Sequence, residues 1–357
     1  MANTRSTPND RLRFPEIGPQ AYEHPTDRAA LVALRKVRGF ETVLRRVFGA
    51  LPERRLRLLY LANAVRVGPH QLPGLDRSLD EVCAILDLAK KPELFVVGDP
   101  RVNAMAVGLD APFIVLNSSL LKLMDPDELR CVIGHEAGHI LSGHALYKTM
   151  LLLLQAMVRW ILRGPLVLPA LPVLLALKEW DRKSELSADR AGLLVSQDLE
   201  VSRRVMIKLA GGSGQEEFSL AEFERQAAEY REGGGVVDQV FKVLNLLEVS
   251  HPFPVLRVLE LGRWAQSEEY ERILAGDYPR RFERPEDEDV VAHASQAMQG
   301  YRAGLEENPA LAELMRGVAS AGRSVWSRLF GDAPDGPEPA GDGEAPPDPG
   351  SDGAAGA

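Results

Sequence analysis

The pentapeptide His135-Glu136-Ala137-Gly138-His139 constrains this 357-residue chain more than any other feature. In a helix, residues four positions apart lie one turn above each other, so His135 and His139 project from the same face. Two imidazoles in this arrangement can hold one zinc ion, and Glu136 beside them can take a proton from a water on the zinc. The alternative is a core helix whose two histidines are satisfied by ordinary hydrogen bonds.

The residues before and inside this motif predict a well-formed helix. Asp125 offers an N-cap oxygen, Pro126 suits the first helical position, and Glu128 completes a capping box. Gly134 and Gly138 each cost about 1 kcal/mol relative to alanine in a helix interior. We therefore expect the backbone of this helix to lie close to another element at the two glycines.

A catalytic zinc site needs a third protein ligand and an open position for water. A histidine six residues after the second one is absent, because that position is Ala145. The next charged helical pattern offers Glu185 as a ligand, with Asp189 one turn later to accept the N–H of a ligand histidine and fix its tautomer. Arg182 would be a counter-charge on the neighbouring part of that face. Such a pattern alone is usually a solvated helix face, but after HExxH it favours a metal site.

Three segments of the chain together resemble the motifs of the HtpX-like zinc metallopeptidases, a family that includes the CAAX prenyl endopeptidases. They are HEAGH, the segment SELSADRAG at 184–192, and Ser250-His251-Pro252 followed by Arg257. Two upstream segments, 102–108 and 114–121, also resemble the family, so that the similarity covers about residues 94 to 261.

The resemblance implies a zincin-like fold and a role for each matching residue. His135, His139 and Glu185 would bind one catalytic Zn²⁺, and Glu136 would be the general base. His251 and Arg257 would stabilise the oxyanion, which needs a donor beyond the metal. Without this context, a His-Pro pair is more often a turn or the start of a helix.

The fold class expected is α+β and predominantly α-helical, with a small β-sheet beside the HExxH helix. Three short runs favour strands: 93–97, 103–108 and 112–116. One of them, on the Asn103 or the Ile114 side, should edge the cleft and could pair with an extended substrate backbone. The candidates for that pairing are Asn103, Ala104 and Met105. The alternative is an ordinary small sheet that only covers the active helix.

The apolar run 150–177 has two interpretations. Arg159, Arg163 and three prolines interrupt it, so neither half is long enough to span a membrane. It is either an extension of the active helix followed by a hairpin packed on the protein, or a shallow hairpin inserted at a membrane surface. Both predict soluble or peripheral behaviour. We expect the following helix, which carries Glu185, to run from Trp180 to about Ser196.

Composition and charge indicate the expected partners, compartment and domain limits of the chain. The net charge of −9, without a basic block, excludes nucleic acid as a partner. The two cysteines, Cys83 and Cys131, are expected to be core residues, which suits a reducing compartment. The polar N-terminal residues do not resemble a secretory signal. We therefore expect a cytoplasmic protein, at most associated with the cytoplasmic face of a membrane. Four histidines lack a metal-site spacing and are interpreted as surface or core residues: His24, His70, His144 and His293. The expected divisions are a flexible N-terminal segment 1–26, a metallopeptidase domain 27–278 (helical part 27–90, catalytic core 91–265), C-terminal helices in 279–331, and a disordered acidic Pro/Gly tail 332–357.

The sequence thus predicts a zinc-dependent metalloendopeptidase that acts on extended or unfolded polypeptides. A prenyl-protein peptidase would need a large intramembrane chamber, and the chain has too few apolar spans to build one. Two rivals remain: a latent protease whose cleft is covered, and a chaperone or binding module that keeps a structural zinc.

Overall fold

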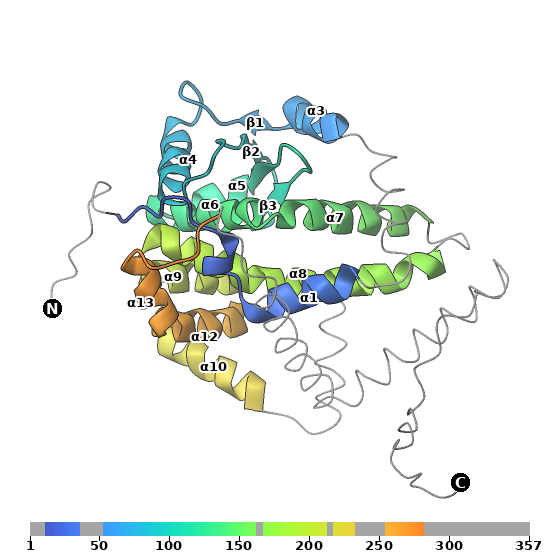
Figure 1. Ribbon diagram of the computed structural model, residues 1–357. Helices are drawn as coiled ribbons and strands as arrows, with labels where there is room; N and C mark the ends of the chain where they lie inside the picture. Colours follow the sequence, from blue (N-terminus) through green and yellow to red (C-terminus); the bar gives the residue numbers. More distant parts are fainter. Residues whose placement is uncertain (1–10, 36–52, 162–166, 213–216, 233–253, 282–357) are drawn as a thin grey trace, which may run out of the picture.

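A pair of packed helices forms the centre of the molecule (Figure 1). They are α6 (Pro126–Leu141), which carries the HExxH motif, and α8 (Val167–Ser196), which carries Glu185. The computed structural model describes residues 11–35, 53–161, 167–212, 217–232 and 254–281. The predicted capping box is present on α6: the Asp125 carboxylate accepts the N–H groups of Asp127 and Glu128, and Glu128 accepts the N–H of Asp125 at 2.8 Å.

The two glycines of α6 allow α8 to approach closely. A Cβ atom on Gly134 would lie 2.7 Å from Cβ of Val195, and a Cβ on Gly138 would overlap Cβ of Ala191. Real Cβ atoms do not approach so closely, so the helices can be this near only because both positions are glycine. The expectation of a close neighbour at these glycines is confirmed, and the neighbour is the helix that bears Glu185.

A four-stranded mixed sheet lies beside α6 and confirms the expected fold class. Its order is β1-β2-β4-β3, with β2 and β4 parallel and β3 antiparallel to β4. Among the strands of the described residues, β3 is therefore at an edge, paired through Ala104 with Leu116 and through Val107 with Phe113. The strands span Val65–Arg66 (β1), Leu94–Val97 (β2), Ala104–Val107 (β3) and Phe113–Asn117 (β4). The two-residue β1 was not predicted, since it is too short to show an alternating pattern.

The remaining helices surround this core. They are η1 (Pro19–Ala21), α1 (Pro25–Arg35), α3 (Glu53–Asn63), α4 (Pro73–Ile85), α5 (Ser118–Leu123), α7 (His144–Ile161), α9 (Leu199–Gly211), α10 (Leu220–Glu232), α12 (Pro254–Ala265) and α13 (Glu268–Leu274). As expected, Cys131 is buried and Cys83 half-buried, and neither forms a disulfide. The expected C-terminal helices in 279–331 lie outside the described residues except for 279–281, and the acidic tail lies wholly outside them.

The apolar run 150–177 forms parts of two separate helices. α6 ends at Leu141, and Gly143 turns the chain with a φ of +69° before α7 begins, so α7 is not an extension of the active helix. α8 begins at Val167, well before the expected Trp180. The earlier start follows from packing, because apolar side chains of α1, α7 and α8 form one buried cluster that includes Leu34, Leu154 and Leu177. Among the described residues, no helix is both long and apolar enough to cross a membrane.

The N-terminal segment differs most from expectation. Residues 1–26 were expected to be flexible, but Phe14, Ile17 and Tyr22 are buried in the main hydrophobic core. Backbone hydrogen bonds join this segment to the far end of the described chain: Gly18 N donates to Pro279 O at 2.9 Å, and Arg281 N donates to Glu16 O at 2.8 Å. The packed body therefore extends past the expected limits at both ends. The segment has no helical or strand period, so its apolar residues gave no recognisable pattern.

Candidate metal centre

Three side chains converge where α6 meets α8. Nε2 of His135 lies 3.4 Å from Oε2 of Glu185, and Nε2 of His139 lies 3.2 Å from Oε1 of the same carboxylate. One donor atom from each residue falls within 4.8 Å of the others. Tetrahedral zinc with ligand bonds near 2.0–2.1 Å separates its ligand atoms by about 3.3 Å. The donor set and its spacing therefore fit one zinc ion.

The second nitrogen of each histidine is held by another side chain. Nδ1 of His135 lies 3.0 Å from Oδ1 of Asp189, and Nδ1 of His139 lies 3.1 Å from Nδ1 of His144. Both Nδ1 atoms are thus engaged away from the carboxylate, and both Nε2 atoms face it. This arrangement suits metal ligation, because the partner at Nδ1 fixes the ring orientation and the tautomer.

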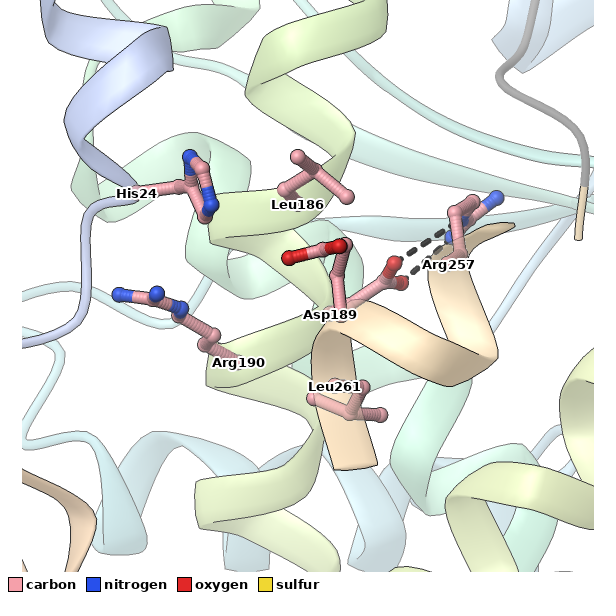
Figure 2. Close-up of a pocket in the computed structure, with 7 residues that line it drawn as sticks. His24, Leu186, Asp189, Arg190, Arg257 and Leu261 are labelled. Atoms are coloured by element: carbon pink, nitrogen blue, oxygen red, sulfur yellow. Dashed lines mark hydrogen bonds and ion pairs between the residues drawn. The ribbon is translucent and has the colours of Figure 1, made fainter. Parts of the chain in front are cut away.

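Arg257 binds Asp189 through two parallel hydrogen bonds, drawn in Figure 2, of 2.7 Å from Nε and 2.5 Å from a terminal nitrogen. Its other terminal nitrogen lies 3.3 Å from Glu185. Burial by itself would raise the pKa of Asp189, but Arg257 and the hydrogen bond from His135 hold it below its ordinary value. Asp189 is therefore an anion shared between His135, a candidate metal ligand, and a buried guanidinium.

Lys148 of α7 contacts the other side of the ligand carboxylate. Its Nζ lies 2.6 Å from Oε1 of Glu185 and 2.7 Å from Oδ1 of Asp181. Burial by itself would lower the pKa of Lys148, but Asp181 and Glu185 raise it above its ordinary value. This cation was not predicted from the sequence. Arg182, which it chose as the counter-charge, is half-buried on α8 one turn before Glu185, and its role stays a prediction.

The ligand histidines have different protonation tendencies. Burial by itself would lower the pKa of His135, but its hydrogen bonds to Asp189 and Glu185 raise it to about 9. The pKa of His139 is instead lowered well below its ordinary value, first by burial and then by the charge on Lys148. His139 is therefore held neutral, which is the form that ligates a metal.

A cavity of about 250 Å³ opens beside the ligands. Its polar wall holds His135, Glu136, Glu185, Asp189 and Arg257. Apolar side chains line the rest, among them Val132, Val205, Met206 and Leu209. The carboxylic acid Glu136 therefore lines the same cavity as His135 and Glu185.

The edge of the sheet borders the same cavity. Asn103 and Ala104 line it, where strand β3 begins. Met105, the third candidate for strand pairing, instead packs against the cluster of Phe95 and Val115. His251, the other residue expected at the site, lies outside the described residues.

His144 is the residue that sequence analysis missed most clearly. It was interpreted as a surface or core histidine, and it is buried against the zinc-ligand candidate His139. The two histidines are five positions apart in the chain, which is not a same-face spacing in a continuous helix. The signal was Gly143, whose left-handed backbone ends one helix and starts the next with His144 turned back toward the motif.

Comparison with known proteins adds to this geometry. The sequence profile of peptidase family M48 matches residues 69–265. The chain is 31% identical over 274 residues to the plastoglobule-localized metallopeptidase 48, chloroplastic, of Arabidopsis thaliana, which covers 74% of this chain and 77% of that protein. The chain belongs to peptidase family M48.

Other M48 relatives match over shorter stretches. A protease HtpX homolog of Moorella thermoacetica is 31% identical over 85 residues, 23% of this chain and 28% of that protein. One of Caldanaerobacter subterraneus is 31% identical over 98 residues, 27% of this chain and 32% of that protein. No solved structure matches. M48 enzymes are zinc metallopeptidases, so the family agrees with the donor set found here.

Proposed function

We propose that this M48 metallopeptidase is an endopeptidase that hydrolyses peptide bonds in extended or unfolded polypeptides. The single observation that carries the proposal is the shared cavity, in which Glu136 lies with the donor atoms of His135 and Glu185 next to an edge strand. An edge strand presents unpaired backbone groups to which an extended chain can add.

In this mechanism His135, His139 and Glu185 hold the metal. Zinc, when bound, supplies polarisation of the scissile carbonyl and acidification of a water. Glu136 accepts the proton of the attacking water and passes it to the leaving amine. Asp189 keeps His135 in the ligating orientation through the 3.0 Å hydrogen bond to its Nδ1.

The oxyanion role assigned to Arg257 and His251 is part of this proposal. Arg257 supports it by its position, because it lines the cavity while its guanidinium is fixed on Asp189 and Glu185. We expect His251→Ala to lower turnover about a hundredfold or more while zinc stays bound. Unchanged turnover would remove His251 from the site.

Substrate is proposed to lie along β3, with its backbone beside Asn103 and Ala104. The cavity is mostly apolar beyond the charged wall, so a substrate side chain that enters it would be apolar. Unfolded polypeptides expose such side chains together with unpaired backbone, which is why they fit this site better than folded proteins.

The first experiment is degradation of casein by the purified, zinc-loaded chain, with Glu136→Gln as the matched control. Cleavage by the wild type alone, at equal zinc content in both proteins, would establish the enzyme and its base. Cleavage by neither, with zinc bound, would favour a latent protease or a binding module. Equal cleavage by both would contradict the role of Glu136.

Latency can be tested by removing the C-terminal part of the chain. The sequence suggests a cut after Tyr278, but Pro279, Arg280 and Arg281 pair with residues 15–18 of the N-terminal segment. The cut therefore belongs after Arg281. A rise in activity would support a covering role for the removed part, and no change would argue against it.

We further propose a cytoplasmic protein that is soluble or, at most, in peripheral contact with a membrane through 150–177. In its described part, this run buries Leu151, Leu154, Leu174 and Leu177 within the protein. The Arabidopsis relative carries a plastoglobule location in its name, which makes lipid contact worth testing here. Retention of the protein in the membrane pellet through a carbonate wash would contradict a peripheral contact.

A further inference from the structure

We propose that Asp27 and His144 form a positioning chain that orients the zinc ligand His139. Nδ1 of His139 lies 3.1 Å from Nδ1 of His144, and Nε2 of His144 lies 3.1 Å from Oδ2 of Asp27. The proposal rests on the zinc site of the proposed function. It adds two residues, Asp27 and His144, to the site. Neither contacts the donor atoms of His135 or Glu185, and neither lines the cavity.

Complete burial makes this chain directional. His139, His144 and Asp27 are each no more than 1% exposed, so water cannot replace any of these contacts. When zinc is bound through Nε2 of His139, that imidazole keeps its proton on Nδ1 and donates it to Nδ1 of His144, and His144 donates from Nε2 to the carboxylate of Asp27, which only accepts. His139 is then the donor at Nδ1, which leaves the lone pair of its Nε2 directed at Glu185 and the metal position.

The carboxylate end of the chain is itself anchored. Oγ of Ser187 donates to Oδ2 of Asp27 at 2.5 Å and accepts the backbone N–H of His24 at 2.9 Å. Ser187 lies on α8 only two residues after Glu185, while Asp27 lies in the first turn of α1. The anchor therefore ties the start of α1 to the same helix that supplies the third ligand.

The two ligand histidines are thus oriented from different parts of the fold. His135 meets its carboxylate, Asp189, directly, and that carboxylate is balanced by Arg257 of α12. His139 meets its carboxylate, Asp27, through the imidazole of His144. Each ligand histidine is therefore oriented by a carboxylate, His135 by Asp189 and His139 by Asp27. Loss of one carboxylate should loosen its own histidine and leave the other in place.

The test measures zinc affinity by competition with a chromophoric chelator in His144→Leu, His144→Asn and wild type. His144→Leu should lower the affinity about 10- to 100-fold, as removal of such partners does in other zinc proteins. The amide oxygen of His144→Asn lies near the position of the lost Nδ1, so it can accept the same N–H but does not reach Asp27, and this variant should recover part of the affinity that His144→Leu loses. Met150→Ala, a fully buried residue of α7 that touches no ligand, controls for loss of packing and should keep its affinity.

A double-mutant cycle separates positioning from general destabilisation. Asp27→Ala should weaken zinc binding in the wild type and add little in the His144→Leu background, because the two residues act through one path. The absorption bands of the Co²⁺-substituted protein should change in His144→Leu and lie closer to the wild-type bands in His144→Asn.

Equal zinc affinity in His144→Leu and wild type would overturn the proposal and leave the zinc site intact. Equal losses in His144→Leu and His144→Asn, or fully additive effects of Asp27→Ala, would also overturn it. Loss of zinc binding in the wild type itself would overturn the proposed function together with this inference.

Discussion

Asp189 joins the metal ligands to the rest of the protein through a single carboxylate. It is 3% exposed and is bound both by His135 and by the guanidinium of Arg257. Asp189→Asn would leave Arg257 buried with its main partner neutralised. Breaking a buried pair in this way costs about 3–5 kcal/mol. We expect a loss of that size in the free energy of unfolding measured with urea, together with weaker zinc binding.

The control for Asp189 is an exposed ion pair on α12, the helix that carries its partner Arg257. Glu260 and Arg263 lie 2.7 Å apart on the surface, with side chains 36% and 54% exposed. Glu260→Gln should change the free energy of unfolding by at most about 1 kcal/mol. Comparable effects of the two substitutions would contradict the importance given to burial.

His24 gives the protein a dependence of stability on pH. Its pKa is lowered from 6.5 to about 3, first by burial and then by the charges on Arg190 and Lys183. Below pH 6.5 the unfolded chain therefore takes up a proton at His24 that the folded protein does not. The contribution is full above pH 6.5 and is lost as the pH falls toward 3.

We expect the free energy of unfolding to fall more steeply between pH 6.5 and 4 in the wild type than in His24→Asn. The asparagine does not titrate, and its amide oxygen can accept the N–H of Thr26 that His24 Nδ1 accepts at 3.2 Å. Urea unfolding at several pH values measures both slopes. Parallel curves would show that His24 does not titrate on unfolding in this range.

At the scale of elements, the contact between α6 and α8 sets the ligand geometry. Gly138→Ala would gain up to about 1 kcal/mol of helix propensity but would force Cβ atoms of the two helices into overlap. Overpacking of this kind costs about 1–3 kcal/mol. We expect a lower melting temperature and weaker zinc binding, because Glu185 and the histidines lie on opposite sides of this contact.

Two further variants test whether the overlap is the cause. Ala191→Gly removes the opposing Cβ and should restore zinc binding to Gly138→Ala. Gly74→Ala lies in α4, where a Cβ would meet nothing within 4 Å, and should leave zinc binding unchanged. Failure of Ala191→Gly to rescue would locate the damage elsewhere.

Local sequence signals predicted the elements that carry the ligands. The capping box, the four-residue spacing of the histidines and the glycines placed α6, and Glu185 with Asp189 placed the facing helix. These signals are local in the chain, or depend on a single periodicity. Lys148 and His144 were missed because their partners come from other helices, across a turn at Gly143 that only the three-dimensional arrangement defines. The start of α8 was also misplaced, since packing against α1 and α7 decides it.

At the scale of the whole molecule, the N-terminal segment completes the body. The hydroxyl of Tyr22 lies 3.0 Å from Oγ of Ser142 and 3.3 Å from the carbonyl oxygen of Gly138, at the end of the HExxH helix. No sequence periodicity predicts this, because an irregular segment that fills a groove has no repeat. The family profile covers residues 69–265 and therefore leaves out Tyr22 and Asp27.

A chain limited to residues 69–265 should lack a stable metal centre. It loses the buried residues of 11–35 and exposes the core that they cover. We expect it to show no cooperative thermal transition and no stoichiometric zinc binding, in contrast to the full chain. In the full chain, Ile17→Ala should cost about 2–5 kcal/mol of unfolding free energy. A shortened chain that melts cooperatively and binds zinc would show that the segment is dispensable.

Asp27 of α1 and Arg257 of α12 both support the metal centre. The two residues are far apart in the sequence, so the ribosome adds them at different times. While the HExxH helix leaves the exit tunnel, the cation that balances Asp189 has not yet been translated. A nascent copy therefore carries its ligands without the group that holds them in place. The metal centre therefore acquires all of its described partners only after Arg257 has been translated.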